Sequence, residues 1–384
     1  MPTSTTDVRV LDYIRYSAGA DRPELSRELD LPLPTVLSSV RRLLAEGHLV
    51  AVDTEEGRAS RGRGRHLLRA SGPRLLLGLI GWRRGRLHTE LYDTGRTRLF
   101  TSSRDAPEPR SGPEGLVDAV GDLIAAAGHL PASRLATVVV SVPAPFLRGK
   151  GAPREHSTLR GLPPGFYVTQ AEDFDAYLGR RFGLTFITEN DANLAALGEQ
   201  YARPERIDNF FYLKLGDTGI GSAVVANGRL SRGAHGYGGE IAHLQLDRTG
   251  QLCHCGGRGC LWMQVRALTL PDAGGGGAGP IDLAGVAGLA ETSDPGAQRM
   301  LADIGRLLAR PLGQISTVLD PDAIIIDSTI GDAVDHVIGG IREQFALEAP
   351  PVIARNVRLE KSSLDDTAEV RGALEIPRET ARHP

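Results

Sequence analysis

The chain of 384 residues is poor in several residue types, and each scarcity narrows the possible classes of protein. Its three cysteines are too few, and odd in number, for a framework of disulfides. Its longest apolar run, residues 75–82, is far shorter than the roughly 20 residues that cross a bilayer. The N-terminal residues lack the basic and apolar segments of a secretory signal. These absences favour a cytoplasmic protein with no membrane partner.

The chain also lacks a strong excess of charge. A formal net charge of −3 gives no overall bias toward nucleic acid or membrane, so any basic surface must be local. Of the 44 basic residues only Lys150, Lys214 and Lys361 are lysine, a bias that says little about function. The length allows two or three domains with ample cores.

The cysteines that are present lie close together. Cys253, Cys255 and Cys260 form a C-x-C-x4-C cluster, and three thiolates at this spacing suit one borderline cation, for which Zn²⁺ is the best match. His243 lies ten residues upstream and is the expected fourth ligand, whereas His254 would point away. A closed Cys3His set leaves no position for a reactive water. We therefore predict a structural zinc site, and the alternative is a set of unlinked thiols.

The first seventy residues predict a DNA-binding domain. Apolar residues at helical spacing indicate helices in residues 7–19, 22–29 and 34–46, and residues 49–52 and 66–68 indicate two short strands around a polar hairpin. Three helices and a two-stranded wing form a winged helix-turn-helix, whose third helix would enter the major groove. The residues expected on the solvent face of that helix are Thr35, Ser38, Ser39 and Arg42.

The expected wing is rich in arginine. Arg61, Arg63 and Arg65 alternate with glycines, and such a strip can enter the narrow minor groove of A·T-rich DNA. The alternative is a solvated linker.

The rest of the chain alternates strands and helices. Residues 75–80, 87–91 and 98–100 predict an antiparallel meander, followed by a helix at 116–127 and a buried strand at 136–142. Asn190 and Asp191 lie between the strand at 185–187 and a helix, where amide and carboxylate can hydrogen-bond a polyol. The alternative is that one of them only caps the helix.

Residues 239–243 (Gly-Glu-Ile-Ala-His) followed by the cysteine cluster resemble the signature of the ROK family of sugar kinases and sugar-responsive repressors. Residues 62–65 (Gly-Arg-Gly-Arg) are similar to the motif that ends the wing of the family's repressors. The resemblance implies an α/β fold, with the winged helix-turn-helix at 1–70 and a two-lobed actin-like (RNase-H-like) sugar-kinase body. We expect its first lobe at 74–188 with 362–384, and its second lobe, with the zinc-binding loop, at 189–361.

The same resemblance implies a sugar site. Asp191 inherits the position of the kinases' general base, and Glu240 and His243 lie on the sugar side. Where the family has a glutamate after the last cysteine, this chain has Leu261 and Trp262, and an indole stacks on a sugar ring but accepts no hydrogen bond. Either the ligand differs from the common hexoses or sugar binding is weaker.

Three nucleotide-binding loops depart from the kinase pattern. The opening strand, residues 78–84, lacks the D-x-G-x-T motif; residues 217–223 lose two glycines of the second phosphate loop; and the strand at 323–326 ends in Asp-Ser-Thr, not Gly-Gly. Because phosphoryl transfer depends on positioning the phosphates, we predict no enzyme activity and no catalytic residue.

The prediction is therefore a ROK-type transcriptional regulator, a repressor in the simplest case. It would bind double-stranded operator DNA as a homodimer or a dimer of dimers and respond to a carbohydrate effector. The alternatives are a sugar kinase with divergent ATP-binding loops and a regulator that has lost its sugar effector.

Overall fold

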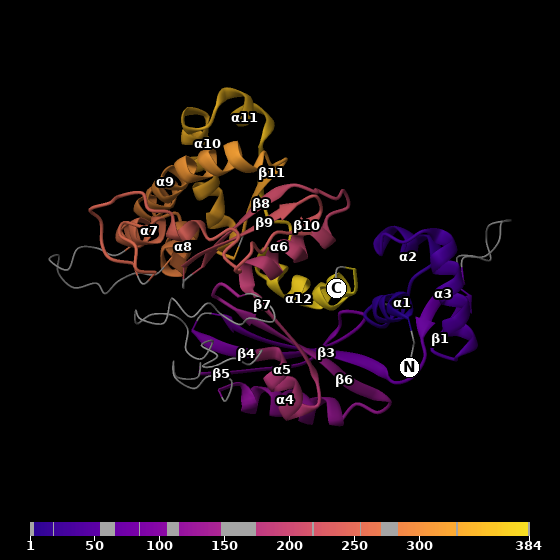
Figure 1. The fold of residues 1–384 in the computed structure, drawn as a ribbon. Helices are drawn as coiled ribbons and strands as arrows, with labels where there is room; N and C mark the ends of the chain where they lie inside the picture. The colour runs from indigo at the N-terminus through magenta and orange to yellow at the C-terminus, as the bar shows by residue number, and fades with distance from the viewer. Residues whose placement is uncertain are drawn as a thin grey trace.

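The computed structural model describes residues 4–17, 19–53, 66–83, 85–105, 115–146, 174–216, 219–253, 255–269, 283–327 and 329–382. They form a small N-terminal unit beside a larger body that contains two five-stranded sheets (Figure 1). Within these ranges no helix is both long enough and apolar enough to cross a membrane.

The N-terminal unit is a winged helix-turn-helix, as predicted. It consists of α1 (Thr5–Arg15), α2 (Arg22–Glu28), α3 (Leu33–Ala45) and the antiparallel pair β1 (Leu49–Asp53) and β2 (His66–Ala70). The apolar faces of the three helices meet in one core that includes Val10, Leu25 and Val40. Ser4 caps α1 and Asp21 caps α2, whereas α3 begins after Pro32 without a side-chain cap. Arg61, Arg63 and Arg65 of the expected wing lie outside the described residues.

The first large sheet has the strand order β5-β4-β3-β6-β7. Its strands β3, β4 and β5 form the predicted antiparallel meander, and β6 and β7 add parallel to β3. The helices α4 and α5 cover one face, where their apolar residues join those of the sheet in one core. The bounds are β3 (Arg74–Arg83), β4 (Arg86–Asp93), β5 (Arg98–Asp105), α4 (Val117–Gly128), β6 (Ser133–Val142), α5 (Phe174–Phe182) and β7 (Thr185–Asn190).

The second large sheet repeats this topology, with the order β10-β9-β8-β11-β12. Again the first three strands are antiparallel and the last two are parallel. Helices from the C-terminal half cover its outer face. The bounds are β8 (Phe210–Gly216), β9 (Gly219–Ala226), β10 (Arg229–Leu230), α7 (Leu261–Thr269), α8 (Leu283–Glu291), α9 (Pro295–Leu319), β11 (Ala323–Ile326), α10 (Val334–Glu348), α11 (Pro351–Asn356) and β12 (Arg358–Lys361). Two such sheets confirm the predicted actin-like, RNase-H-like fold.

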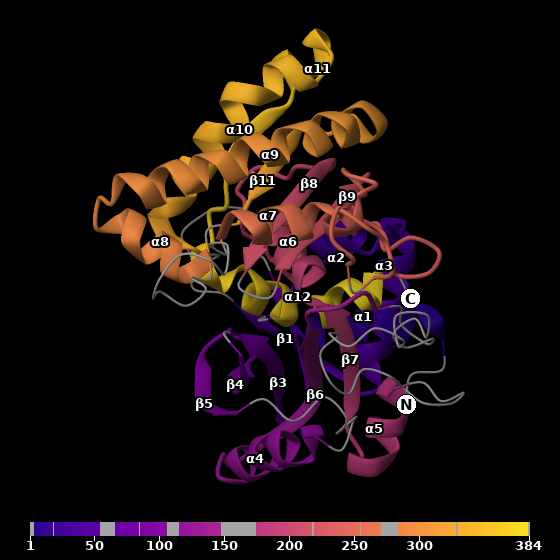
Figure 2. The same cartoon turned by 90° about the vertical axis from the view of Figure 1, so that its left-hand side faces the viewer.

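Two helices lie between the sheets, α6 (Asp191–Ala202) and α12 (Ala368–Arg382) (Figures 1 and 2). Apolar residues of both helices pack on the first sheet, and Ala195, Ala196 and Ala368 pack on the second. The helices cross at Gly198 and Gly372, where a β-carbon on either glycine would overlap the backbone of the other helix. This close crossing puts the N-terminal ends of both helices at the junction of the two sheets.

Candidate functional site

A cluster of buried charges lies at the junction between the sheets. Asp191 is the first residue of α6 and directly follows β7. The amine of Lys214 on β8 donates to Oδ2 of Asp191 at 2.8 Å and to Oε2 of Glu369, near the start of α12, at 2.9 Å. One ammonium group therefore bridges two carboxylates from two different helices.

The cluster continues into the first sheet. Nε of Arg83 on β3 lies 3.9 Å from Oε1 of Glu369, and a β-carbon on Gly81 would lie 3.1 Å from the same oxygen. Trp82, on the other face of β3, is half-buried and packs against the core beneath α4. Arg83 thus lies on the side of β3 that carries the charged cluster, and Trp82 lies on the opposite side.

The electrostatics of the cluster follow from burial and pairing. Although burial disfavours its charge, the carboxylates of Asp191 and Glu369 raise the pKa of Lys214 above its ordinary range. Burial also raises the pKa of Asp191, and the charge of Lys214 opposes that rise. Against the cost of burial, Lys214 and Arg83 lower the pKa of Glu369. The cations keep both buried carboxyls usable as hydrogen-bond acceptors.

Glu240 faces Asp191 from a loop held against β9. The hydroxyl of Ser222 on β9 donates to the carbonyl of Gly239, whose φ of +96° suits a glycine. Burial, and then the charge of Asp191, raise the pKa of Glu240 to about 7. Among the described residues its carboxyl forms no hydrogen bond or ion pair, so it is available to a ligand hydroxyl in either protonation state.

Asn190 has a structural role. Its Oδ1 accepts the backbone N–H of Asn193 at 3.0 Å, as a helix cap does, and its Nδ2 donates to the carbonyl of Ala144 at 3.1 Å. A ligand that bonded to Asn190, as predicted, would have to share its amide oxygen with the N–H of Asn193 or its amide nitrogen with the carbonyl of Ala144. The capping alternative therefore describes Asn190, while the carboxylate of Asp191 stays with Lys214.

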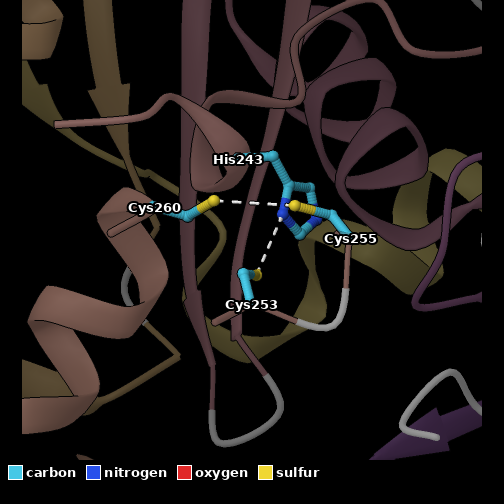
Figure 3. A group of neighbouring side chains, drawn as sticks. All are labelled: His243, Cys253, Cys255 and Cys260. Atoms are coloured by element: carbon cyan, nitrogen blue, oxygen red, sulfur yellow. Dashed lines mark hydrogen bonds between the residues drawn. The ribbon is translucent and has the colours of Figure 1, made fainter. Parts of the chain in front are cut away.

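The three cysteines and His243 form a compact cluster, in which the four ligand atoms all lie within 4.8 Å of one another (Figure 3). His243 ends a short 3-10 turn, Ile241–His243, directly after Glu240. The backbone N–H of Cys253 donates to the carbonyl of Gly257 at 2.8 Å, and Cys260, which precedes α7, pairs with Gln245 in a backbone bridge. Burial, and then hydrogen bonding with Cys255, raise the pKa of the Cys260 thiol to about 12. A bound cation would favour the thiolates instead.

The spacing of these atoms fits a tetrahedral metal. Sγ of Cys253 lies 3.6 Å from Nδ1 of His243, and Sγ of Cys255 lies 3.5 Å from Sγ of Cys260. Usual zinc bond lengths give tetrahedral edges of about 3.6 Å between sulfur and nitrogen and about 3.8 Å between sulfurs. The four side chains can therefore hold a metal ion, and His243 would use Nδ1.

Trp262 is half-buried and packs against the core of the second sheet. It belongs to α7, directly after Leu261.

The exposed face of α3 differs from the prediction. Thr35 and Ser38 are exposed as expected, but Ser39 is fully buried and donates to Oδ1 of Asp7 at 2.5 Å. Placing Ser39 on the solvent face is wrong, because its position on the helix points toward α1. Arg42 is half-exposed, but its guanidinium binds both oxygens of Asp7. Arg41 is exposed and forms no ion pair in the described residues.

Sequence reasoning missed three residues that this geometry makes prominent: Lys214, Glu369 and Arg41. The signal for Lys214 was its rarity, since it is one of three lysines in a chain that otherwise uses arginine. Arg41 lies three residues after Ser38, a spacing that shares a helix face. No local pattern pointed to Glu369.

The fold and the clustered side chains define a class of protein: a body of two five-stranded sheets, with a cysteine–histidine cluster that can hold a metal ion and an N-terminal winged helix-turn-helix. The ROK family model matches residues 82–380, and the chain belongs to the ROK family.

Individual relatives include both regulators and kinases. The xylose repressor of Bacillus spizizenii is 28% identical over 205 residues, which are 53% of this chain and 53% of that protein, so the chain matches about half of this relative's length. A crystal structure of a ROK family transcriptional regulator, homologous to the MLC protein of Escherichia coli, covers 98% of this chain and 97% of its own, with a TM-score of 0.73 and 21% identity. A Streptomyces griseus glucokinase solved with glucose and AMPPNP covers 79% of this chain and 99% of its own, with a TM-score of 0.61 and 23% identity.

Proposed function

We propose that this protein is a DNA-binding transcriptional regulator, a repressor in the simplest case, whose kinase-like body senses a sugar or sugar derivative without phosphorylating it. The observation that carries the proposal is the position of α12. Near one end of this helix, Glu369 bonds to Lys214 beside Asp191, and near the other end, Arg378 bonds to Tyr13 of the N-terminal unit. Operator binding places the protein in the cytoplasm.

The buried carboxyls of Asp191 and Glu240 support recognition of a polyol. Glu240 presents an unpaired carboxyl beside Asp191, and carboxylates bind sugar hydroxyls through strong charge-assisted hydrogen bonds. A ligand hydroxyl that donates to Oδ2 of Asp191 competes with Lys214 for that oxygen. Ligand binding would therefore loosen the salt bridge that joins β8, α6 and α12.

The buried charges argue against phosphoryl transfer. A general base must accept a proton from the sugar hydroxyl, and Oδ2 of Asp191 already accepts a hydrogen bond from the ammonium of Lys214 at 2.8 Å. Asp327, where the family's kinases have a glycine turn, is a buried carboxylate that accepts from the hydroxyl of Tyr212 at 2.7 Å. An acidic side chain thus takes the place of the glycine that lies against the nucleotide in the family's kinases.

The far end of α12 provides the route to the DNA-binding unit. Arg378 donates to the hydroxyl of Tyr13 on α1 at 2.5 Å, and its guanidinium lies 4.6 Å from the centre of that ring. Nε of Arg9 donates to the carbonyl of Ala381 at 3.1 Å. A ligand that moves the start of α12 would move these contacts, and it changes DNA binding only if its affinity differs between the two arrangements.

Zinc is the metal that the cysteine cluster suits best. Three thiolates and one imidazole at tetrahedral spacing match structural zinc, and a closed ligand set performs no chemistry. The metal would hold the loop that carries Glu240, because His243 lies three residues after it.

The proposed binding to operator DNA depends on the exposed residues of α3 and on the two-fold symmetry of a homodimer. Thr35, Ser38 and Arg41 are exposed on one face of α3, where major-groove contacts would form. Arg61, Arg63 and Arg65 of the wing would add minor-groove contacts. A homodimer, or a dimer of such dimers, would place two copies of α3 on an inverted repeat.

Selection of genomic fragments tests the proposal. Purified protein is incubated with duplex fragments of its source genome, and bound fragments are sequenced with and without a pool of sugars. We expect a discrete inverted repeat whose recovery changes with one sugar. A repeat that ignores every sugar would support the alternative of a regulator without an effector, and no specific repeat would contradict DNA regulation.

The alternative of a sugar kinase is favoured by one observation, the presence of Asp191 at the position of the family's general base. An ATP-consumption assay over hexoses, pentoses and amino sugars tests it. We expect no turnover above that of Asp191→Asn. Turnover that disappears in Asp191→Asn would establish the kinase.

A further inference from the structure

Two exposed leucines lie on α3, the helix that the proposed function places in the major groove. Leu33 is the first residue of α3 and is 43% exposed, and Leu37, one turn further on, is 40% exposed. Residues four apart lie on the same side of a helix, so the two leucines form one apolar strip on its surface. Arg41 continues this row by one more turn and is exposed as well.

The strip is not part of the packing of the N-terminal unit. The core of that unit takes Val36, Val40 and Leu43 from α3, and neither exposed leucine is among the described residues of that core. The helix α1 packs against α12 of the body, whereas α3 lies on the outer side of the unit, beyond α1 (Figure 1). The strip therefore faces outward, where a large partner can reach it.

The charge around the strip favours DNA as that partner. Residues 33–45 of α3 include Arg41 and Arg42 and no acidic residue. Asp7 offsets the charge of Arg42, whereas Arg41 forms no ion pair in the described segments of the chain. An apolar strip that ends at an uncancelled cation matches the edge of a DNA groove, where charged phosphates border the base edges.

The chemistry of leucine limits what the strip can recognise. A leucine side chain forms no hydrogen bond, so covering a polar base edge with it would leave the donors and acceptors of the base unsatisfied. The four bases display one apolar group in the major groove, the C5-methyl group of thymine. Contact between that methyl group and a leucine removes apolar surface of both from water, which is favourable.

We propose that Leu33 and Leu37 read thymine methyl groups, so that each half of the inverted repeat contains thymine where the start of α3 enters the groove. The first residues of a recognition helix are the ones that contact base edges, which is where these leucines lie. Leu33 and Leu37 then select for T·A base pairs, while Arg41 contributes affinity through a phosphate. This inference rests on the proposed function and names part of the sequence that the operator must contain.

Replacement of thymidine by deoxyuridine tests the contact, because the two differ only by that methyl group. In the inverted repeat recovered by genomic selection, each thymidine is replaced in turn, symmetrically in both halves. Anisotropy at fixed salt then gives the dissociation constants of the full-length, zinc-loaded protein. For wild type we expect at least one replacement to weaken binding about fourfold per methyl group, since a buried carbon of this size contributes about 0.8 kcal/mol.

The effect should disappear in Leu33→Ala/Leu37→Ala, because the side chains that cover the methyl group are gone. Leu33→Met/Leu37→Met keeps two apolar side chains of similar size and should retain it. Leu289→Ala, at a leucine of α8 that is 44% exposed, is the matched control and should respond to deoxyuridine as wild type does. Each ratio compares two DNAs with the same protein preparation, so a fraction of unfolded protein does not change it.

The possible outcomes separate this inference from the proposed function. A specific repeat that tolerates deoxyuridine at every position would overturn the inference and leave the proposed function intact. An equal loss in wild type and in the double alanine variant would also overturn it, because the methyl group would then act without the leucines. If no specific repeat is recovered, the proposed function fails and this inference fails with it.

Discussion

Lys214 is the side chain on which the charge balance between the two sheets depends. Replacing it with methionine leaves Asp191 and Glu369 buried without their shared cation. Removing one partner of a buried ion pair costs about 3–5 kcal/mol, so we expect the free energy of unfolding at pH 7.5 to fall by about that amount. Urea denaturation of the zinc-loaded protein measures it.

The pH dependence of the same variant has a definite sign. Without Lys214 the folded-state pKa of both carboxyls rises above the unfolded value near 4. Folding then takes up protons, so the lost stability returns as the pH falls toward the unfolded pKa. We expect a smaller difference from wild type at pH 5 than at pH 7.5. Lys361→Met, which breaks the exposed pair with Asp332, should cost less than about 1 kcal/mol at either pH. Equal losses in the two variants would contradict the role assigned to Lys214.

Substitutions of two neighbouring arginines of α3 are expected to affect different properties, one DNA binding and the other stability. Arg41→Ala should weaken operator binding and reduce the salt slope by about one, because one phosphate contact is lost, while leaving thermal stability unchanged. Arg42→Ala should lower stability, because Asp7 is only 2% exposed and loses its charged partner. Anisotropy titrations at several salt concentrations and thermal unfolding measure the two effects. The reverse pattern would show that Arg42 is the DNA contact.

The loss of stability expected for Arg42→Ala depends on pH because it involves the carboxyl of Asp7. The hydrogen bonds from Arg42, opposed by burial, lower the pKa of Asp7. Its contribution to stability is therefore present above the unfolded pKa near 4 and is lost as the pH falls through the lower folded value. The difference in stability between wild type and Arg42→Ala should shrink below pH 4.

At the scale of elements, the crossing of α6 and α12 has almost no spare volume. A methyl group on Gly372 would overlap the carbonyl of Leu194, and neither backbone can yield without shifting the packing on both sheets. We expect Gly372→Ala to destabilise the protein by more than about 3 kcal/mol, at the upper end of single substitutions. Gly339→Ala is the control, because that helical position of α10 has no atom within 4 Å of the added methyl. It should be neutral, or stabilise by up to about 1 kcal/mol.

The loop that carries the cysteine cluster is the second element that a substitution can test. Cys255→Ser removes one of four ligands, so we expect the zinc content to fall from about one ion per chain and the melting temperature to drop. Elemental analysis and thermal unfolding measure both. Thr249→Ser, in the same loop but outside the cluster, is the control. A Cys255→Ser protein with full metal content would show that the ligand set is wrong.

The sequence predicted the elements whose signal is local. Amphipathic spacing predicted α1 to α3, and the spacing of Cys253, Cys255 and Cys260 predicted that they form one cluster. It did not predict the salt bridge of Lys214 with Glu369, because 155 residues separate the partners and only the packing of α12 between the sheets joins them. It misplaced Ser39 because a small error in the orientation of a helix moves a residue from the solvent face to the core.

At the scale of the whole molecule, the two sheets share one topology, and α12 runs from Lys214, at the junction of the sheets, to the winged helix-turn-helix. Under the proposed function, this helix connects the DNA-binding unit to the candidate sugar site. Coupling of this kind is typically worth 1–3 kcal/mol, or about 5- to 150-fold in affinity.

The most direct test measures that coupling as the dissociation constant for the selected inverted repeat, at fixed salt, with and without the selected sugar. In the wild-type protein we expect the sugar to change this constant at least fivefold. In Glu240→Gln, affinity for the repeat without sugar should equal that of wild type, and the response to sugar should be lost. An unchanged dissociation constant in wild type, with sugar binding demonstrated by calorimetry, would contradict the account.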